Sequence, residues 1–142
     1  MTLKNLDNLV RANQLKVEPP DQAEFDGLVN SARKRIADAG LENMSEEGKF
    51  LSAYGAAYSL SLAALRWHGF RPENRFIAFQ CLQHTVGISK EKWRVLDKCH
   101  KQRNLAEYEG HLEQPDKLFD DLLAITQELL KRVEALTSKE AE

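Results

Sequence analysis

The polar side chains best suited to chemistry lie close together in the sequence, between Trp93 and His111. In an α-helix, residues three or four positions apart share a face, so steps of this size link six of these side chains into one ridge. The members of this polar ridge are His100, Arg103, Asn104, Glu107, Tyr108 and His111. Arginine binds phosphate oxygens through paired hydrogen bonds, and amide and phenol groups add further ones. The ridge therefore predicts a phosphate or ribose site, although the same spacing also suits a solvated helix face with pairs such as Arg103–Glu107.

Motifs for several other chemistries are missing from the sequence. It contains no glycine-rich phosphate loop, no His-Glu-x-x-His zinc motif, no paired-cysteine motif and no Gly-x-Ser-x-Gly elbow. No two histidines are three or four residues apart, so a pair of metal ligands on one helical face is not encoded. We therefore expect neither a metal site nor a cofactor.

Cys81 and Cys99 are the only cysteines, which is too few for a disulfide framework. A reduced, cytoplasmic setting is expected. Cys99 precedes Arg103 by one turn, where a cation could lower the pKa of a thiol. A free cysteine behaves more often as a small buried hydrophobe, and we expect this of Cys99.

The charge of the chain is close to balanced overall but uneven along its length. The length of 142 residues suits one domain. The net charge of -2 lacks the excess of positive charge found in a protein that coats nucleic acid non-specifically. Residues 90–109 hold six Lys and Arg against four acids, whereas residues 110–142 hold four against eight. Any contact with RNA is therefore expected around the ridge and not over a broad basic surface.

Helix signals punctuate the whole chain. Cap residues at Asp21, Ser45 and Ser89 and stop signals at Gly40 and Gly110 divide it into amphipathic segments. The expected helices cover about 3–14, 21–39, 45–68, 74–86 and 89–109, and a last one begins at 115–116. No strand is expected, because β-branched residues are scarce and nowhere alternate.

The segments together predict an all-α fold, an antiparallel up-and-down bundle of four to five helices in a single domain over 1–142. Its core is expected over about 21–136, with an N-terminal helix and linker over 1–20 and a frayed tail over 137–142. The 16 residues from Phe50 to Leu65 carry no charge, but a membrane span needs about 20 apolar residues. We therefore expect a buried central helix here and no membrane partner. On the ridge helix, Trp93, Leu96, Cys99 and Ala106 are expected to face the core, and Leu105 is a further candidate for this side.

The pair Arg103-Asn104, followed by an aromatic residue at Tyr108, resembles the Arg-Asn-x-x-x-His signature of HEPN domains (higher eukaryotes and prokaryotes nucleotide-binding). The alanine-rich segment from Ala53 to Arg66 and its exit at 69–72 resemble an earlier helix of that family. The resemblance covers roughly 21–136. It implies a helical bundle that is usually dimeric, with the polar ridge at the subunit interface.

The resemblance also implies an activity. In active members the motif Arg and His carry out metal-independent RNA cleavage, in which the ribose 2′-OH attacks the neighbouring phosphate. Arg103 and Asn104 match the motif, while Tyr108 stands at the position of the family's His. A phenol with a pKa near ~10 is a poor general base at neutral pH, and His100, one turn before Arg103, could substitute.

Three functions remain open from the sequence. The first is a HEPN-like module that binds RNA, a nucleotide or a protein partner through Arg103, Asn104, Glu107, Tyr108 and His111. The second is a metal-independent ribonuclease toxin that uses Arg103 with Tyr108 or His100 and pairs with a nucleotidyltransferase-type antitoxin. The third is a structural or regulatory helical partner in which the ridge stabilises a homodimer.

Two further arginines follow the alanine-rich segment. Arg71 and Arg75 could extend a phosphate-binding patch, or they could be solvated surface charges.

Overall fold

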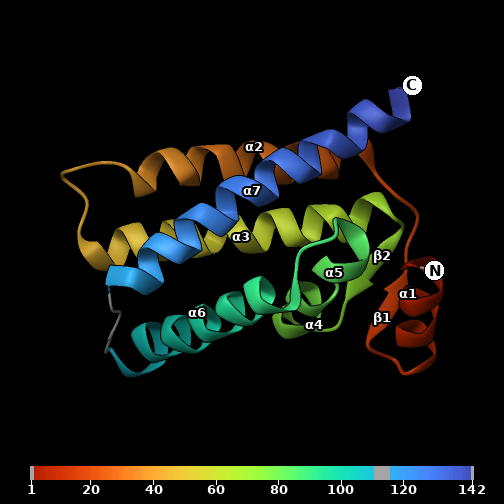
Figure 1. Ribbon diagram of the computed structural model, residues 1–142, viewed down its shortest axis with the longest axis horizontal. Coiled ribbons are helices and arrows are strands. Elements are labelled where there is room, and N and C mark those ends of the chain that lie inside the picture. The colour runs from red at the N-terminus through yellow and green to blue at the C-terminus, as the bar shows by residue number, and fades with distance from the viewer. Residues whose placement is uncertain (1, 111–115, 142) are drawn as a thin grey trace.

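The computed structural model describes residues 2–110 and 116–141. Its long helices are α2 (Gln22–Ala39), α3 (Glu46–Trp67), α6 (Lys90–Glu109) and α7 (Asp116–Ala141), and successive ones run in opposite directions (Figure 1). The shorter elements are α1 (Thr2–Arg11), β1 (Leu15–Val17), β2 (Phe70–Pro72), α4 (Arg75–Gln80) and α5 (Leu82–Thr85). The prediction of an all-α, antiparallel up-and-down bundle is confirmed.

The beginnings of three long helices follow from their capping residues. The side chains of Asp21, Ser45 and Ser89 each accept a hydrogen bond from the backbone N–H three residues later. At the other end of α6, Gly110 has a φ of 64°, a left-handed conformation that glycine adopts without a steric penalty. These boundaries agree with the prediction, because caps are local signals.

The expected helix over 74–86 is instead divided at Cys81 into α4 and α5. The division lets one short segment serve two apolar clusters. Phe79 and Leu82 lie in the main core, whereas Ile77, Ala78 and Cys81 lie in a second core, to which α1 and β1 contribute Leu6 and Leu15.

Helix α3 is the centre of the bundle and contacts α2, α6 and α7. Its charge-free segment is buried on several sides, as predicted, with Ala53, Leu60 and Ala64 fully inaccessible. Small side chains allow the neighbouring helices to approach closely. No helix in the described part of the chain is long and apolar enough to cross a membrane.

The prediction that the chain has no strand was wrong at two three-residue segments. Strands β1 and β2 pair antiparallel, with Leu15 opposite Pro72 and Val17 opposite Phe70. The pairing continues through a hydrogen bond of 2.9 Å from the Glu18 N–H to the Gly69 carbonyl. Three residues are too few for an alternating pattern to stand out in the sequence.

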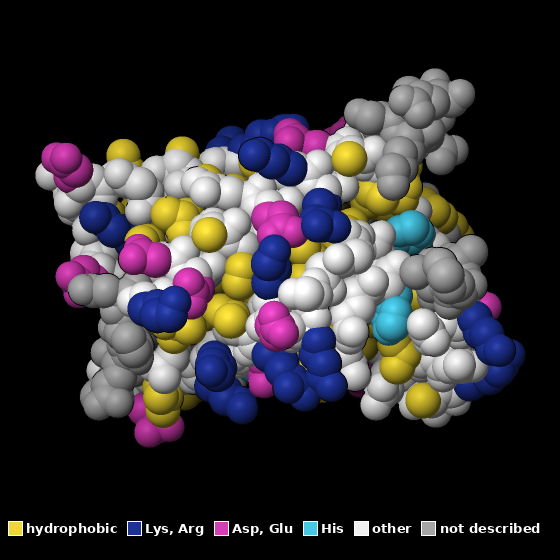
Figure 2. Space-filling view, in the orientation of Figure 1, with side chains coloured by type: hydrophobic (Ala, Val, Ile, Leu, Met, Phe, Trp, Pro, Cys, Tyr) yellow, Lys and Arg dark blue, Asp and Glu magenta, His cyan; other side chains and the backbone are white. Residues whose placement is uncertain are grey.

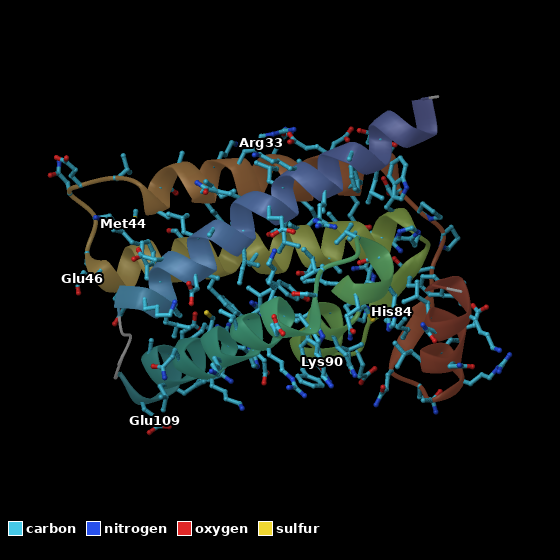
Figure 3. All side chains as sticks on the ribbon, in the orientation of Figure 1. Arg33, Met44, Glu46, His84, Lys90 and Glu109 are labelled. Carbon is cyan, nitrogen blue, oxygen red and sulfur yellow. The ribbon has the colours of Figure 1, made fainter. Side chains whose placement is uncertain are left out.

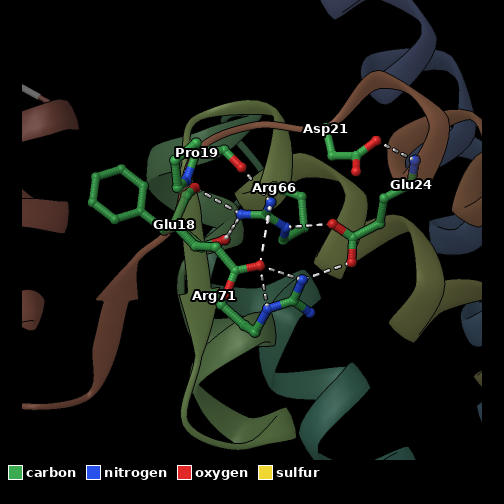
Figure 4. A network of polar contacts seen from close by, with 7 residues as sticks. Glu18, Pro19, Asp21, Glu24, Arg66 and Arg71 are labelled. Atoms are coloured by element: carbon green, nitrogen blue, oxygen red, sulfur yellow. Dashed lines mark hydrogen bonds and ion pairs between the residues drawn. The ribbon is translucent and has the colours of Figure 1, made fainter.

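A network of charges, here called the arginine clamp, fixes the segment after β1 to the end of α3 (Figure 4). Arg66 is only 1% exposed, and its Nε donates to a Glu24 carboxylate oxygen at 2.7 Å. Its terminal nitrogens donate to the backbone carbonyls of Glu18, Pro19 and Phe70. Arg71 joins the carboxylates of Glu18 and Glu24, each at 2.7 Å. A buried guanidinium is tolerated here because its donors find acceptors.

The N-terminal segment, expected as a helix and linker, packs on the bundle as a short arm formed by α1 and β1. Leu6 and Leu15 are buried in the second core. A hydrogen-bond contact of 3.3 Å between Asn5 and His84 joins α1 to α5, where His84 is labelled in Figure 3. At the other end, α7 continues to Ala141, through residues that were expected to form a frayed tail.

The face of the molecule in Figure 2 carries charges of both signs. Asp and Glu side chains lie among Lys and Arg side chains over α7, while Lys and Arg gather along the lower edge near α6. This distribution agrees with the uneven charge of the sequence.

Candidate functional site

Helix α6 holds the polar ridge and extends between Lys90 and Glu109, which are labelled in Figure 3. Its core side holds four buried residues, as predicted: Trp93, Leu96, Cys99 and Ala106. Leu105, the further candidate for this side, is half-buried. The ridge lies elsewhere on the helix surface, with His100, Arg103 and Asn104 half-buried and Glu107 and Tyr108 exposed. His111, also predicted as a binding residue, lies outside the described residues.

The structure brings four of the predicted ridge residues into direct contact. The Arg103 Nη1 donates to Asn104 Oδ1 at 3.1 Å, and its Nη2 forms an ion pair of 3.1 Å with Glu107. The Asn104 Nδ2 lies 3.4 Å from His100 Nε2. Tyr108 contributes less directly, because the centre of its ring lies 5.9 Å from the Arg103 Cζ. The predicted spacing therefore corresponds to a connected set of side chains.

Sequence reasoning did not identify the α3 side of this site. The Tyr54 hydroxyl lies 2.8 Å from His100 Nδ1, and the two rings stack with centroids 6.1 Å apart. Tyr58 lies one turn further along α3, where its ring supports the guanidinium of Arg75 on α4 at 4.2 Å. The Arg75 guanidinium also lies 5.6 Å from the Tyr54 ring. Two tyrosines four residues apart in a charge-free helix were the available signal, because a buried phenol needs a polar partner.

We call this set the Arg75–Arg103 site, and it comprises Tyr54, Tyr58, Arg75, His100, Arg103, Asn104, Glu107 and Tyr108. Its charge is only partly neutralised. Within the described residues, no carboxylate lies at ion-pair distance from Arg75, and Glu107 is the one acid paired with Arg103. Arg71 does not belong to the site, because both clamp carboxylates hold it.

The environment keeps the Tyr54–His100 pair at the centre of the site uncharged. Burial lowers the pKa of His100, and the nearby cations Arg103 and Arg75 lower it further. Burial raises the pKa of the Tyr54 phenol, although Arg75 acts in the opposite direction. At neutral pH the pair is therefore a neutral imidazole beside a protonated phenol.

The Cys99 thiol is not a nucleophile of this site. Burial is the main cause that raises its pKa to about 12, so the thiolate is scarce at neutral pH. Cys99 is buried in the main core, where it packs as a small hydrophobe. This agrees with the expectation from the sequence.

The donor set favours an anion over a metal. Two guanidinium groups, an amide and a phenol can surround phosphate oxygens, whereas the two guanidinium charges repel a metal cation. Among the residues that the structure describes, no group of three or more His, Cys, Asp and Glu could hold a metal ion. His100 is engaged at both ring nitrogens, so it could act as a general base only after one contact breaks. No protein-family model matches the chain, and no curated protein is significantly similar to it in sequence.

Proposed function

We propose that the chain is a HEPN-like module that binds single-stranded RNA or a nucleotide through its phosphate groups at the Arg75–Arg103 site. One observation carries this proposal. Arg75 and Arg103 come from two different helices and flank one Tyr54–His100 pair, with Glu107 as the one carboxylate at ion-pair distance among the described residues. A phosphate group supplies the negative charge that such a pair of guanidinium groups lacks.

An exposed aromatic ring beside the cations favours RNA or a nucleotide over inorganic phosphate. Tyr108 is 74% exposed, and it lies next to Arg103 on the last turn of α6. Stacking of a base on an aromatic side chain contributes about 1–3 kcal/mol and tolerates any base. Tyr108 would therefore bind a base while Arg103 binds the adjoining phosphate.

The proposal includes a homodimer. The resemblance to HEPN domains implies that the ridge lies at the subunit interface, so two copies of Arg103 would line one cleft. Light scattering on the wild type tests this part of the proposal, and a monomer at micromolar concentration would contradict it.

Binding is tested with a fluorescently labelled single-stranded RNA in EDTA over a series of salt concentrations. Arg103→Ala and Arg75→Ala should each weaken binding about tenfold and lower the slope of log K against log salt by about one. Lys34→Ala is the matched control, since Lys34 is an exposed cation on α2 outside the site, and it should bind like the wild type. Unchanged binding in both arginine variants, or no binding of RNA and AMP by the wild type, would overturn the proposal.

The same samples test the ribonuclease alternative. The lowered pKa of His100 favours it, because a neutral imidazole can accept a proton at pH 7. The contacts of both ring nitrogens oppose it. If the wild type cleaves RNA in EDTA and Arg103→Ala does not, the protein is a metal-independent ribonuclease that uses Arg103. If the RNA stays intact, the ribonuclease alternative fails and only the binding function remains.

A further inference from the structure

The hydrogen bonds around His100 form a chain whose direction is fixed at one end. Arg103 carries only donors, so Asn104 must turn its carbonyl oxygen toward Arg103, at 3.1 Å. The Asn104 amide nitrogen, which is also a donor, then faces His100 Nε2 at 3.4 Å. A donor can be opposed only by an acceptor, so Nε2 carries no proton.

The same logic continues to α3. A neutral imidazole with an unprotonated Nε2 carries its proton on Nδ1. This Nδ1–H lies 2.8 Å from the Tyr54 hydroxyl oxygen, which therefore accepts. The chain thus leads from Arg103 through Asn104 and His100 to Tyr54, and in each of its three contacts a donor is opposed by an acceptor.

We propose that Tyr54 is the positioning residue of the Arg75–Arg103 site. Its hydroxyl holds His100 as the Nδ1–H tautomer, and His100 then keeps Asn104 turned so that its carbonyl orients Arg103. The role of Arg103 toward RNA rests on the proposed function, whereas the tautomer of His100 does not depend on it.

Tyr54 is suited to this role by its place in the fold. It is buried on the central helix α3, and its ring packs edge-on against Phe79 with centroids 5.9 Å apart. A side chain held in this way has little rotational freedom, so its hydroxyl is a fixed reference point. Tyr54 therefore connects the orientation of a half-buried arginine on α6 to the core of the bundle.

The titration of His100 is part of the same proposal. The groups that face it are Tyr54 from α3, Arg75 from α4, and Asp97, Lys101, Arg103 and Asn104 from α6. Protonation places a second N–H on the imidazole, at Nε2, opposite the amide N–H of Asn104. The contact with Asn104 is then lost. Burial of the imidazole, and after it the cations Arg103, Arg75 and Lys101, oppose this protonation, so the chain persists below the pH at which an ordinary histidine titrates.

The tautomer is measured by long-range ¹H–¹⁵N correlation spectra of the imidazole nitrogens in the full-length, RNA-free protein. His100→Gln identifies the signals of His100. We expect the wild type to show a protonated Nδ1 and an unprotonated Nε2, and Tyr54→Phe to lose this single state. Tyr58→Phe is the matched control, because it removes a phenol one turn away on the same helix and should leave the tautomer unchanged. A wild type with a protonated Nε2, or a Tyr54→Phe spectrum identical to the wild type, would overturn the proposal.

RNA binding gives the second measurement. Tyr54→Phe should weaken binding about three- to tenfold, the change that corresponds to one hydrogen bond, with the salt slope unchanged since both guanidinium charges remain. Thermal unfolding of Tyr54→Phe and Tyr58→Phe shows whether each variant is folded. A folded Tyr54→Phe with wild-type affinity for RNA would contradict the proposal that Tyr54 positions Arg103. If the wild type has the expected tautomer but binds no RNA, the proposed function fails and the assignment of Tyr54 to His100 stands.

Discussion

The molecule has two groups of arginines that differ in how completely their charge is neutralised. In the clamp, Arg66 is buried, and its donors contact carboxylates and backbone carbonyls. In the Arg75–Arg103 site, the Arg103 side chain is 16% exposed and contacts one neutral amide and one exposed carboxylate. Among the described residues, both clamp arginines have carboxylate partners, whereas Glu107 is the one carboxylate at ion-pair distance from Arg103 and none lies at that distance from Arg75. The acceptors around an arginine, more than its burial, therefore distinguish the structural role of the clamp from the binding role that we propose for the site.

The largest expected effect is that of removing the central arginine of the clamp. Arg66→Met should lower the free energy of unfolding by about 3 kcal/mol or more, because breaking a buried ion pair leaves its partners without compensation. The carbonyls of Glu18, Pro19 and Phe70 would lose their donor as well. Urea denaturation followed by circular dichroism measures this, with Lys34→Met as an exposed control. A loss below 1 kcal/mol would mean that the clamp does not hold the fold.

The next effect separates stability from binding. Arg103→Ala should weaken RNA binding about tenfold, which corresponds to about 1.4 kcal/mol. It should change the free energy of unfolding by less than 1 kcal/mol, in contrast to Arg66→Met, because its ion pair with Glu107 reaches the surface. If Arg103→Ala destabilised the fold as much as Arg66→Met, the two groups of arginines would not differ in role.

Acid should weaken the clamp gradually. The hydrogen bond from Arg71 lowers the pKa of Glu18, and the hydrogen bonds from Arg66 and Arg71 lower that of Glu24. A carboxylate with a lowered folded-state pKa stabilises fully above the unfolded value of about 4.3, and the stabilisation is lost as the pH falls through the folded value. Glu24→Gln should therefore reduce the loss of stability between pH 5 and 3, measured by urea denaturation at each pH.

On acidification, His100 contributes a loss of stability that begins at a higher pH than the loss from the carboxylates. The reason is that the folded-state pKa of His100 is also lowered. The unfolded chain binds a proton near its ordinary value of about 6.5, so stability falls as the pH drops below that value. His100→Gln should remove this part of the profile and leave the carboxylate part unchanged. The carboxylate part of the profile, below pH 5, is judged from Glu24→Gln. If this variant lost stability there in parallel with the wild type, Glu24 would not stabilise the clamp.

The smallest effect is expected for Arg71. Its side chain is 36% exposed, and its two carboxylate partners are also in contact with solvent. Arg71→Ala should cost no more than about 1 kcal/mol of unfolding free energy, as is usual for ion pairs near the surface. RNA binding should stay at the wild-type level, since Arg71 lies outside the Arg75–Arg103 site. A tenfold loss of RNA binding would instead include Arg71 in the site.

The features that could be predicted from the sequence are those encoded locally. The caps at Asp21, Ser45 and Ser89 and the core side of α6 depend on residues within one or two turns. The shared helix face of His100, Asn104, Arg103 and Glu107 was predicted for the same reason. Local spacing was thus sufficient for one half of the candidate site.

The other half depends on pairings between distant segments. Tyr54 and His100 are 46 residues apart, and Arg66 and Pro19 are 47 apart. No local pattern states which distant partner a buried phenol or guanidinium will find. The pairing of β1 with β2 was missed for the same reason, and three-residue strands gave no alternation to detect it.

The arm formed by α1 and β1 has a practical consequence for anyone who shortens this chain. A fragment that begins at Asp21, where the predicted core starts, would uncover Leu65, Phe70 and Ile77 of the second core. It would also deprive Arg66 of the carbonyls of Glu18 and Pro19. Such a fragment would expose apolar side chains next to the charged side chain of Arg66, and it is therefore expected to aggregate. The first twenty residues therefore belong to the smallest piece worth purifying.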